Sequence, residues 1–332
     1  MLANIPLWPS GKQSQTPEEE EPPQNFKPTF GVALGGGAAR GWAHIGVLRA
    51  LSESGIEPDI VCGTSIGAVV GGCYLADKLD DLADFATGLS KRKIFGLMDF
   101  SFGGSGLITG RKLSDLLIRH LGDTQIEQLS RPFAAVSTEL GTGHEIWIKS
   151  GSLSHALRCS YALPGVFEPV RLGGRWLVDG ALVNPIPVSV CRALGARIVL
   201  AVNLNSDNFG RGTTVVHELP PAPPDMLPDL ENKLDATFGG PVSRILRRQF
   251  FGRKSGSLPG ISGVMMESYN IIQDRIGRSR LAGDPPDSIL SLRLGHLGLF
   301  DFHRAEEAIE IGYQSAIKAI DDIQLHIDSL PT

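Results

Sequence analysis

Short apolar runs alternate with segments of helical periodicity through most of this sequence. The first run, Thr29–Leu34, is apolar and ends in glycines, as a buried parallel strand does. The next segment, Ala39–Glu53, predicts a helix, and Gly55 can end it. Its large apolar side chains recur at helical spacing, at Trp42, Ile45, Leu48 and Leu51. The chain therefore opens with a strand–turn–helix unit.

The same alternation continues further along. Strands are predicted at Asp59–Cys62, Arg131–Glu139, Arg197–Val202 and Ser288–Leu292. Helices are predicted at Ser65–Leu75, Ser152–Ala162, Pro187–Leu194 and Phe302–Lys318. Strands that alternate with helices indicate a mainly parallel sheet with helices on both faces. The expected fold class is therefore α/β, with three α/β/α layers.

Three stretches depart from this alternation. Residues 1–28 are polar and proline-rich, with an acidic run at Glu18–Glu21, which predicts a disordered leader. Residues 205–263 are loop-like and proline-rich, which indicates an irregular insertion and a candidate lid. Residues 321–332 follow the closing helix as a C-terminal tail. A single domain over residues 29–320 is predicted.

Composition narrows the classes of function that the protein can have. The 332 residues carry a net charge of −5, so no overall basic field favours nucleic acid as a partner. The four cysteines include no CxxC pair, which argues for a reducing compartment and against a disulfide scaffold or a zinc site. The apolar stretch Ile66–Ala76 is too short to span a membrane, and the N-terminus lacks a secretory pattern. We expect a cytoplasmic protein, with peripheral membrane contact left open.

The segment Gly63-Thr64-Ser65-Ile66-Gly67 fits the pattern G-x-S-x-G. A strand precedes it and a helix follows, which is the context that a nucleophilic serine requires. The glycines Gly63 and Gly67 allow a tight turn, and the helix N-terminus favours developing negative charge. The alternative is a Gly-Ser turn that only begins a helix.

A glycine-rich loop, Gly35–Gly41, follows the first predicted strand. The dinucleotide-binding pattern fails because Ala38 and Arg40 occupy positions that need glycine, and the P-loop fails because Trp42 and Ala43 follow Gly41. What remains is a row of backbone N–H groups at a helix start. Such a loop can bind an anion or the oxyanion of acyl transfer. The alternative is close packing of strand on helix.

The segment Asp179-Gly180-Ala181 follows the apolar stretch Arg175–Val178. A nucleophilic serine needs a base, and none of the eight histidines has a readable carboxylate partner. A carboxylate beside Ser65 could take the proton directly, which would give a Ser–Asp dyad. Taken alone, Asp-Gly is more often a plain turn.

The glycine loop, the GTSIG elbow and the DGA box, in this order, resemble the patatin-like phospholipase family, and its compact bacterial members most strongly. The resemblance covers residues 30–204 and 284–318. Further stretches agree with it, at Gly104–Gly110, Arg158–Val170, Asn184–Val188 and Asp301–Gly312. It implies a patatin-like fold and a serine esterase or lipid acyl hydrolase.

The resemblance also implies the roles of individual residues. Ser65 would be the nucleophile and Asp179 the base. The oxyanion hole would be formed by backbone N–H groups around Gly36, Gly37 and Ala38, and Arg40 matches the basic residue of that loop. The implied reaction proceeds through an acyl-enzyme and needs no metal or cofactor. Three positions depart from the family pattern, at Gly35, Ala38 and Cys159, and none removes a backbone N–H.

Two segments could bring lipid to such a site. Pro241–Lys254 is a basic amphipathic segment suited to an anionic lipid surface, through Arg244, Arg247, Arg248 and Arg253. Lys91–Phe102 could line the mouth of the site. For both, the alternative is a solvated basic face packed on the domain. A regulatory or lipid-binding protein without relevant turnover also remains open, and the oligomeric state is not readable.

Overall fold

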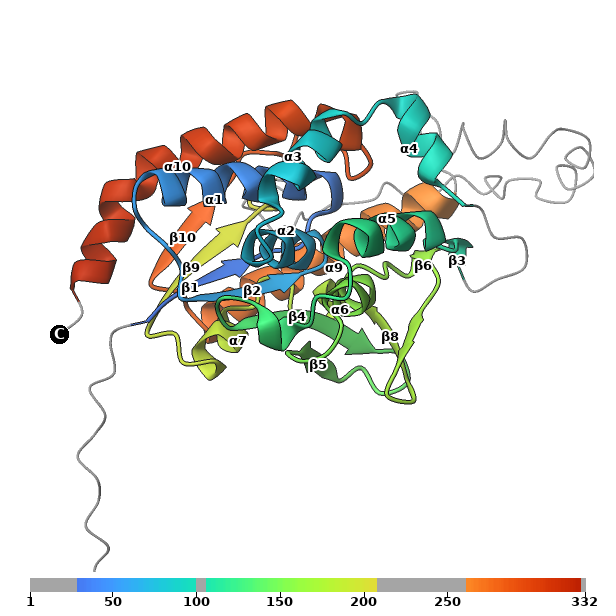
Figure 1. Cartoon of the computed structure of the whole chain (residues 1–332), viewed down its shortest axis with the longest axis horizontal. Helices are drawn as coiled ribbons and strands as arrows, with labels where there is room; N and C mark the ends of the chain where they lie inside the picture. The colour runs from blue at the N-terminus through green and yellow to red at the C-terminus, as the bar shows by residue number, and fades with distance from the viewer. Residues whose placement is uncertain (1–28, 100–105, 208–260, 330–332) are drawn as a thin grey trace, which may run out of the picture.

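The computed structural model describes residues 29–99, 106–207 and 261–329 (Figure 1). Its central sheet has the strand order β10-β9-β1-β2-β4-β8-β7, with β5 paired to β4. The strands are β1 (Phe30–Leu34), β2 (Ile60–Thr64), β4 (Phe133–Glu139), β5 (Glu145–Ile148), β7 (Val170–Leu172), β8 (Arg175–Asp179), β9 (Ile198–Asn203) and β10 (Ser288–Ser291). The predicted strands are thus confirmed, and β5, β7 and β8 are additional.

The sheet is mainly parallel. Strands β10, β9, β1, β2 and β4 run in one direction, whereas β5, β8 and β7 pair in antiparallel fashion. Every residue of β1 and β2 is buried, which explains their uninterrupted apolar sequences. A separate pair joins β3 (Gly106–Ile108) to β6 (Gly165–Phe167). The carboxyl ends of the parallel strands meet at one edge, where ligands bind in open α/β sheets.

Helices cover both faces of the sheet. One core joins α1 (Ala43–Glu53), α2 (Ile66–Leu75), α6 (Leu153–Ser160) and α10 (Ala305–Asp328) to the sheet. A second core on the opposite face contains α7 (Val188–Ala193) and Leu281 of α9 (Ile261–Gly283). Helix α3 (Leu79–Thr87) packs on α2, and α5 (Arg111–Leu121) and α4 (Lys91–Leu97) lie further to the right in Figure 1. This arrangement is the three-layer α/β/α fold that the sequence predicts.

Helices α1 and α10 lie against each other along the upper part of Figure 1. Two glycines make the close approach possible. A Cβ atom at Gly46 would lie 1.9 Å from the Ile309 carbonyl oxygen, and one at Gly312 would lie 2.0 Å from the Ala43 carbonyl oxygen. Any side chain at either position would force the two helices apart.

The closing helix is longer than the sequence predicts. It continues past Lys318 to Asp328, so most of the predicted tail 321–332 is helical. The extension is held by packing, because Ile320, Ile323 and Ile327 contact the main core. The predicted leader 1–28 lies outside the described residues, as does most of the predicted insertion, residues 208–260. At the end of that insertion, helix α9 begins at Ile261.

Candidate active site

Ser65 sits at the turn between β2 and α2. Its backbone angles are φ 57° and ψ −124°, a region that side-chain-bearing residues rarely adopt. The flanking glycines are sterically required, since a Cβ at Gly63 would lie 2.4 Å from Ala68 and one at Gly67 would lie 2.2 Å from the Leu34 carbonyl oxygen. The GTSIG segment therefore forms a sharp strand-to-helix turn that presents the serine hydroxyl.

The Asp179 carboxylate lies directly beside that hydroxyl. Ser65 Oγ donates to Asp179 Oδ2 at 2.6 Å, and the Ala181 amide donates to Asp179 Oδ1 at 2.8 Å. Asp179 ends β8, and a Cβ at Gly180 would lie 2.3 Å from the Val136 carbonyl oxygen. The DGA box thus combines a carboxylate, a residue small enough for the turn, and an amide that fixes the carboxylate.

Burial sets the acidity of Asp179. The carboxyl is fully enclosed, and this desolvation raises its pKa to about 6, against the opposing effect of hydrogen bonds from Ser65, Ala181 and, more weakly, Tyr269. A base with a pKa near 6 is ionised at neutral pH and still has substantial proton affinity. Such a value suits general-base work near pH 7.

Two further hydroxyl groups form hydrogen bonds with the backbone of Ser65 and Asp179. Ser160 Oγ accepts from the Ser65 amide at 2.9 Å and donates to the Val136 carbonyl at 2.5 Å. Thr138 Oγ1 donates to the Asp179 carbonyl at 2.9 Å. Sequence reasoning missed both roles. Ser160 lies within a stretch that carried the family resemblance, and its position there was the available signal.

The glycine loop offers two backbone donors, not three. The Gly36 amide donates to the Pro185 carbonyl at 2.9 Å, so its predicted place as an oxyanion donor is not supported. No acceptor within the described residues takes the amides of Gly37 or Ala38. Ala38 lines the same cavity as Ser65 and has φ 48°, a left-handed value that explains why the family pattern has glycine there.

The Arg40 side chain supports the glycine loop through hydrogen bonds to residues distant in sequence. Its Nε donates to the Leu297 carbonyl at 2.9 Å and its Nη1 to Asn205 Oδ1 at 3.0 Å, while Asn205 Nδ2 donates to the Gly36 carbonyl at 3.2 Å. The Arg40 side chain is buried and is not part of the cavity lining. The structure thus gives this predicted oxyanion-hole residue a positioning role.

His44 supports the loop from below. Its Nε2–H donates to the Gly35 carbonyl at 2.7 Å, and burial lowers its pKa to about 4. The imidazole is therefore neutral at physiological pH. It is not among the residues that line the cavity with Ser65.

Ser65 and Asp179 line an apolar cavity of about 200 Å³. Helix α2 forms one wall from Ile66 to Cys73, and the eight residue steps from Ser65 to Cys73 correspond to about 12 Å of helix. The other walls come from α3, α4 and α5, with side chains such as Leu82, Phe85, Ile94, Leu97, Leu117 and Leu121. This shape and lining suit an acyl chain.

The predicted mouth segment Lys91–Phe102 is partly confirmed as cavity wall. Ile94, Leu97 and Met98 line the cavity, whereas the cationic residues Lys91–Lys93 of α4 are exposed. Residues 100–105 lie outside the described part of the chain. The basic segment Pro241–Lys254, with its four arginines, also lies outside it.

Helix α9 adds two polar side chains that the sequence did not reveal. Tyr269 and Gln273, one helical turn apart, both line the cavity together with Ser65 and Asp179. Gln273 is 3% exposed, and its Oε1 accepts from Asn205 Nδ2 at 3.4 Å. Their i, i+4 spacing was the available signal, but no helix was predicted there.

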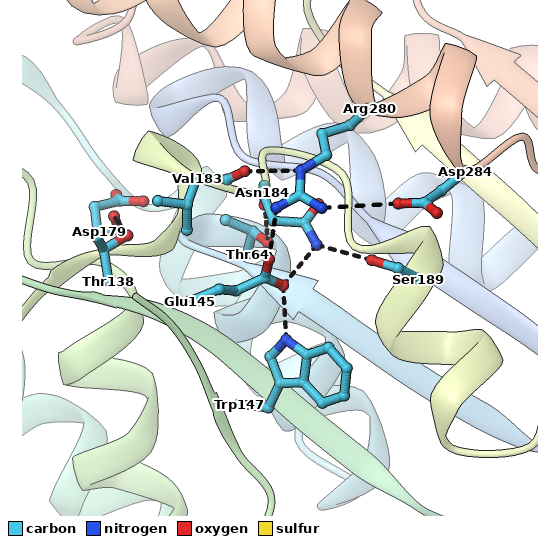
Figure 2. Close-up of polar contacts among 10 residues, drawn as sticks. All are labelled: Thr64, Thr138, Glu145, Trp147, Asp179, Val183, Asn184, Ser189, Arg280 and Asp284. Carbon is cyan, nitrogen blue, oxygen red and sulfur yellow. Dashed lines mark hydrogen bonds and ion pairs between the residues drawn. The ribbon is translucent and has the colours of Figure 1, made fainter. Parts of the chain in front are cut away.

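A polar cluster fastens α9 to the domain (Figure 2). Arg280 Nη2 donates to Glu145 Oε2 at 2.8 Å and Arg280 Nε donates to the Val183 carbonyl at 3.1 Å. Glu145 Oε1 accepts from Asn184 Nδ2 at 2.8 Å, and the Asn184 carbonyl accepts from Thr64 Oγ1 at 2.8 Å. The cluster therefore connects α9 to the residue that precedes Ser65.

Within the described residues, no group of three or more histidine, cysteine, aspartate or glutamate side chains could hold a metal ion. Among the same residues, no helix is long and apolar enough to cross a membrane. The four cysteines are buried and unpaired.

Comparison with known proteins identifies the family. The model of the patatin-like phospholipase family matches residues 32–192. The chain is 30% identical to an uncharacterized NTE family protein of Mycobacterium tuberculosis, over 91% of this chain and 94% of that protein. This chain belongs to the patatin-like phospholipase family and is a hydrolase of the phospholipase and esterase type.

Its relatives include proteins named for the NTE family and for lipid hydrolysis. A lysophospholipase of Emericella nidulans is 33% identical over 55% of this chain, which corresponds to 12% of that protein. A patatin-like phospholipase domain-containing protein of Caenorhabditis elegans is 39% identical over 53% of this chain and 14% of that protein. The family supports lipid acyl hydrolysis in general terms.

Proposed function

We propose that this protein hydrolyses acyl esters of phospholipids or lysophospholipids through a Ser65–Asp179 dyad and an acyl-enzyme. The observation that carries the proposal is the 2.6 Å hydrogen bond from Ser65 Oγ to Asp179 Oδ2 at the wall of an apolar cavity. The name of the Emericella relative favours lysophospholipids among the substrates to be tested first.

The mechanism follows from the placement of these groups. Asp179 accepts the Ser65 proton as the hydroxyl attacks the ester carbonyl, and the amides of Gly37 and Ala38 stabilise the tetrahedral oxyanion. Each well-aimed donor of this kind contributes about 3 kcal/mol to the transition state. The protonated Asp179 then returns its proton to the leaving alcohol, and water hydrolyses the acyl-enzyme by the same steps in reverse order.

The decisive experiment is labelling with a fluorophosphonate probe followed by peptide mapping. Wild-type protein should be labelled at Ser65, Ser65→Ala should not be labelled, and Asp179→Asn should react much more slowly. Lysophospholipid turnover should show the same order. A folded wild type that is neither labelled nor active would refute the dyad and favour a regulatory or lipid-binding protein.

We propose in addition that the protein takes its substrate from an anionic lipid surface. The exposed cations Lys91, Arg92 and Lys93 lie on the same helix as cavity residues Ile94 and Leu97, which supports this orientation. Replacing the three cations with glutamate should weaken binding to phosphatidylglycerol vesicles and leave turnover of a water-soluble ester unchanged. Unaltered vesicle binding in that variant, and in a second one with Arg244, Arg247, Arg248 and Arg253 replaced, would refute it.

A further inference from the structure

Tyr269 presents a buried hydroxyl that the reaction outlined above does not use. The hydroxyl is inaccessible to solvent and forms no short, well-aligned hydrogen bond with a described group. Its contacts with the Asp179 carboxylate and with Gln273 are weak hydrogen bonds, and the one with Asp179 affects the acidity of both groups. A buried donor that is only weakly satisfied can form a better hydrogen bond with a bound substrate.

The position of the ester in the site can be assigned from groups already described. The carbonyl carbon must lie at Ser65 Oγ, and the carbonyl oxygen must face the amides of Gly37 and Ala38. The acyl chain takes the apolar cavity along α2. The leaving oxygen must then lie beside Asp179, because this carboxyl returns the proton to it. The Tyr269 hydroxyl also interacts with Asp179, and Tyr269 lines the same cavity.

We propose that Tyr269 is a further catalytic residue, whose hydroxyl donates a hydrogen bond to the leaving-group oxygen of the ester. This inference rests on the proposed function. As the bond between the carbonyl carbon and the leaving oxygen breaks, negative charge develops on that oxygen, and the phenol stabilises it. The proton that completes the alcohol comes from Asp179, so Tyr269 keeps its own proton throughout.

The chemistry of the phenol agrees with this role. Burial, together with the neighbouring Asp179 charge, raises the pKa of Tyr269 well above its usual value. The hydroxyl is therefore a donor over the whole working pH range. Helix α9 is fixed by the Arg280 cluster, so the donor is held in place before substrate binds.

The proposal predicts a dependence on the leaving group. Two esters of the same fatty acid, a 4-nitrophenyl ester and an ethyl ester, give the same acyl-enzyme but differ greatly in leaving-group basicity. In Tyr269→Phe, we expect the acylation rate to fall about 100-fold for the ethyl ester. It should fall only a few-fold for the 4-nitrophenyl ester, because nitrophenolate needs little stabilisation.

Tyr161→Phe is the matched control. Tyr161 also lines the cavity and also has a buried hydroxyl that forms no short, well-aligned hydrogen bond, but its charged neighbours are Arg158 and Asp99 and not Asp179. This variant should change the two acylation rates by the same factor. Acylation is measured by rapid mixing, as the burst for the 4-nitrophenyl ester and by quench for the ethyl ester.

Equal losses for the two esters in Tyr269→Phe would overturn the proposal, because a merely structural residue would affect both. An unchanged rate for the ethyl ester would overturn it as well. Failure of the proposed function is distinguishable, since wild-type protein would then show neither a burst nor labelling at Ser65.

Discussion

Ser65 combines a reactive side chain with backbone angles that glycine adopts more readily. The turn holds the residue there because β2 and α2 are both buried and the glycines on either side pack against neighbouring backbone. Strain of this kind costs on the order of 1–3 kcal/mol per residue. The fold thus holds the proposed nucleophile in a conformation that lowers stability.

This strain predicts an order among inactive variants. Ser65→Gly should be more stable than Ser65→Ala, because glycine adopts φ 57° without a Cβ clash. We expect a difference of about 1 kcal/mol in the free energy of unfolding, measured in urea at equilibrium, after allowing for the greater entropy of glycine in the unfolded chain. Equal stabilities, or a more stable alanine variant, would contradict the strain.

Asp179 lowers stability through its charge. Its pKa rises from 3.8 in the unfolded reference to about 6 in the folded protein, because burial disfavours the ionised form. The folded state therefore binds the proton more tightly, and the free energy of unfolding falls as the pH rises from about 4 to about 6. Above pH 6 the whole penalty is present, about 3 kcal/mol for a shift of this size.

Asp179→Asn removes this penalty while keeping an acceptor for the Ala181 amide. The variant should be more stable than wild type at pH 8, by up to about 3 kcal/mol. The two curves should converge near pH 4 in urea unfolding followed across pH. Wild-type turnover should fall as the pH drops through about 6, where the base becomes protonated. A constant difference in stability across this range would contradict the assignment.

Helix α9 is the element that sequence analysis did not find, and its burial pattern explains why. It buries the polar residues Asn270, Gln273 and Asp274 and leaves Ile271 and Ile272 more than 40% exposed. A search for apolar residues at helical spacing therefore has no consistent signal there. By contrast, β1 and β2 are fully buried, and helix α1 between them has an apolar inner face. The sequence patterns of these three elements could therefore be recognised.

The candidate site likewise has parts that the sequence predicts and parts that it does not. The positions of Ser65 and Asp179 could be predicted because each belongs to a short motif with a local steric reason for its glycines. The engagement of the Gly36 amide by Pro185 could not, because it depends on a contact between residues far apart in sequence. The positioning role of Arg40 depends on Asn205 and Leu297 for the same reason.

We expect the hydrogen bonds of Arg280 to hold α9 in place. Arg280→Met removes hydrogen bonds to Glu145 and to the Val183 carbonyl, which should cost about 1–2 kcal/mol and increase amide exchange in α9. Asp284→Asn is the control, because Asp284 is 3.8 Å from Arg280 and substantially exposed, and its loss should be small. Hydrogen exchange measured by mass spectrometry compares the two. Equal exchange in both variants would show that the Arg280 cluster does not fix α9.

At the scale of the whole molecule, helices α1 and α10 pack against each other although they are far apart in the sequence. Helix α1 follows the glycine loop directly, so its position affects the amides of Gly37 and Ala38. The two helices meet at Gly46 and Gly312, where backbone touches backbone. Helix α10 thus supports the glycine loop, which is distant from it in the sequence.

Two helical glycines test this contact. Gly312→Ala places a methyl group 2.0 Å from the Ala43 carbonyl oxygen and should destabilise the protein by about 2–3 kcal/mol. Gly277→Ala in α9 meets only Pro185, at 4.0 Å, and should stabilise it by up to about 1 kcal/mol through helix propensity. Thermal unfolding distinguishes the two, and a neutral Gly312→Ala would contradict the packing.

Much of the cavity wall comes from a part of the chain that carries none of the proposed catalytic groups. Ser65, Asp179 and the glycine loop lie at the ends of sheet strands, whereas helices α3, α4 and α5, within residues 79–121, supply a large share of the apolar lining. Mutations can therefore accumulate in that helical block without disturbing the chemistry. Selectivity for the acyl chain can therefore evolve through these helices, with little effect on the rate of the reaction.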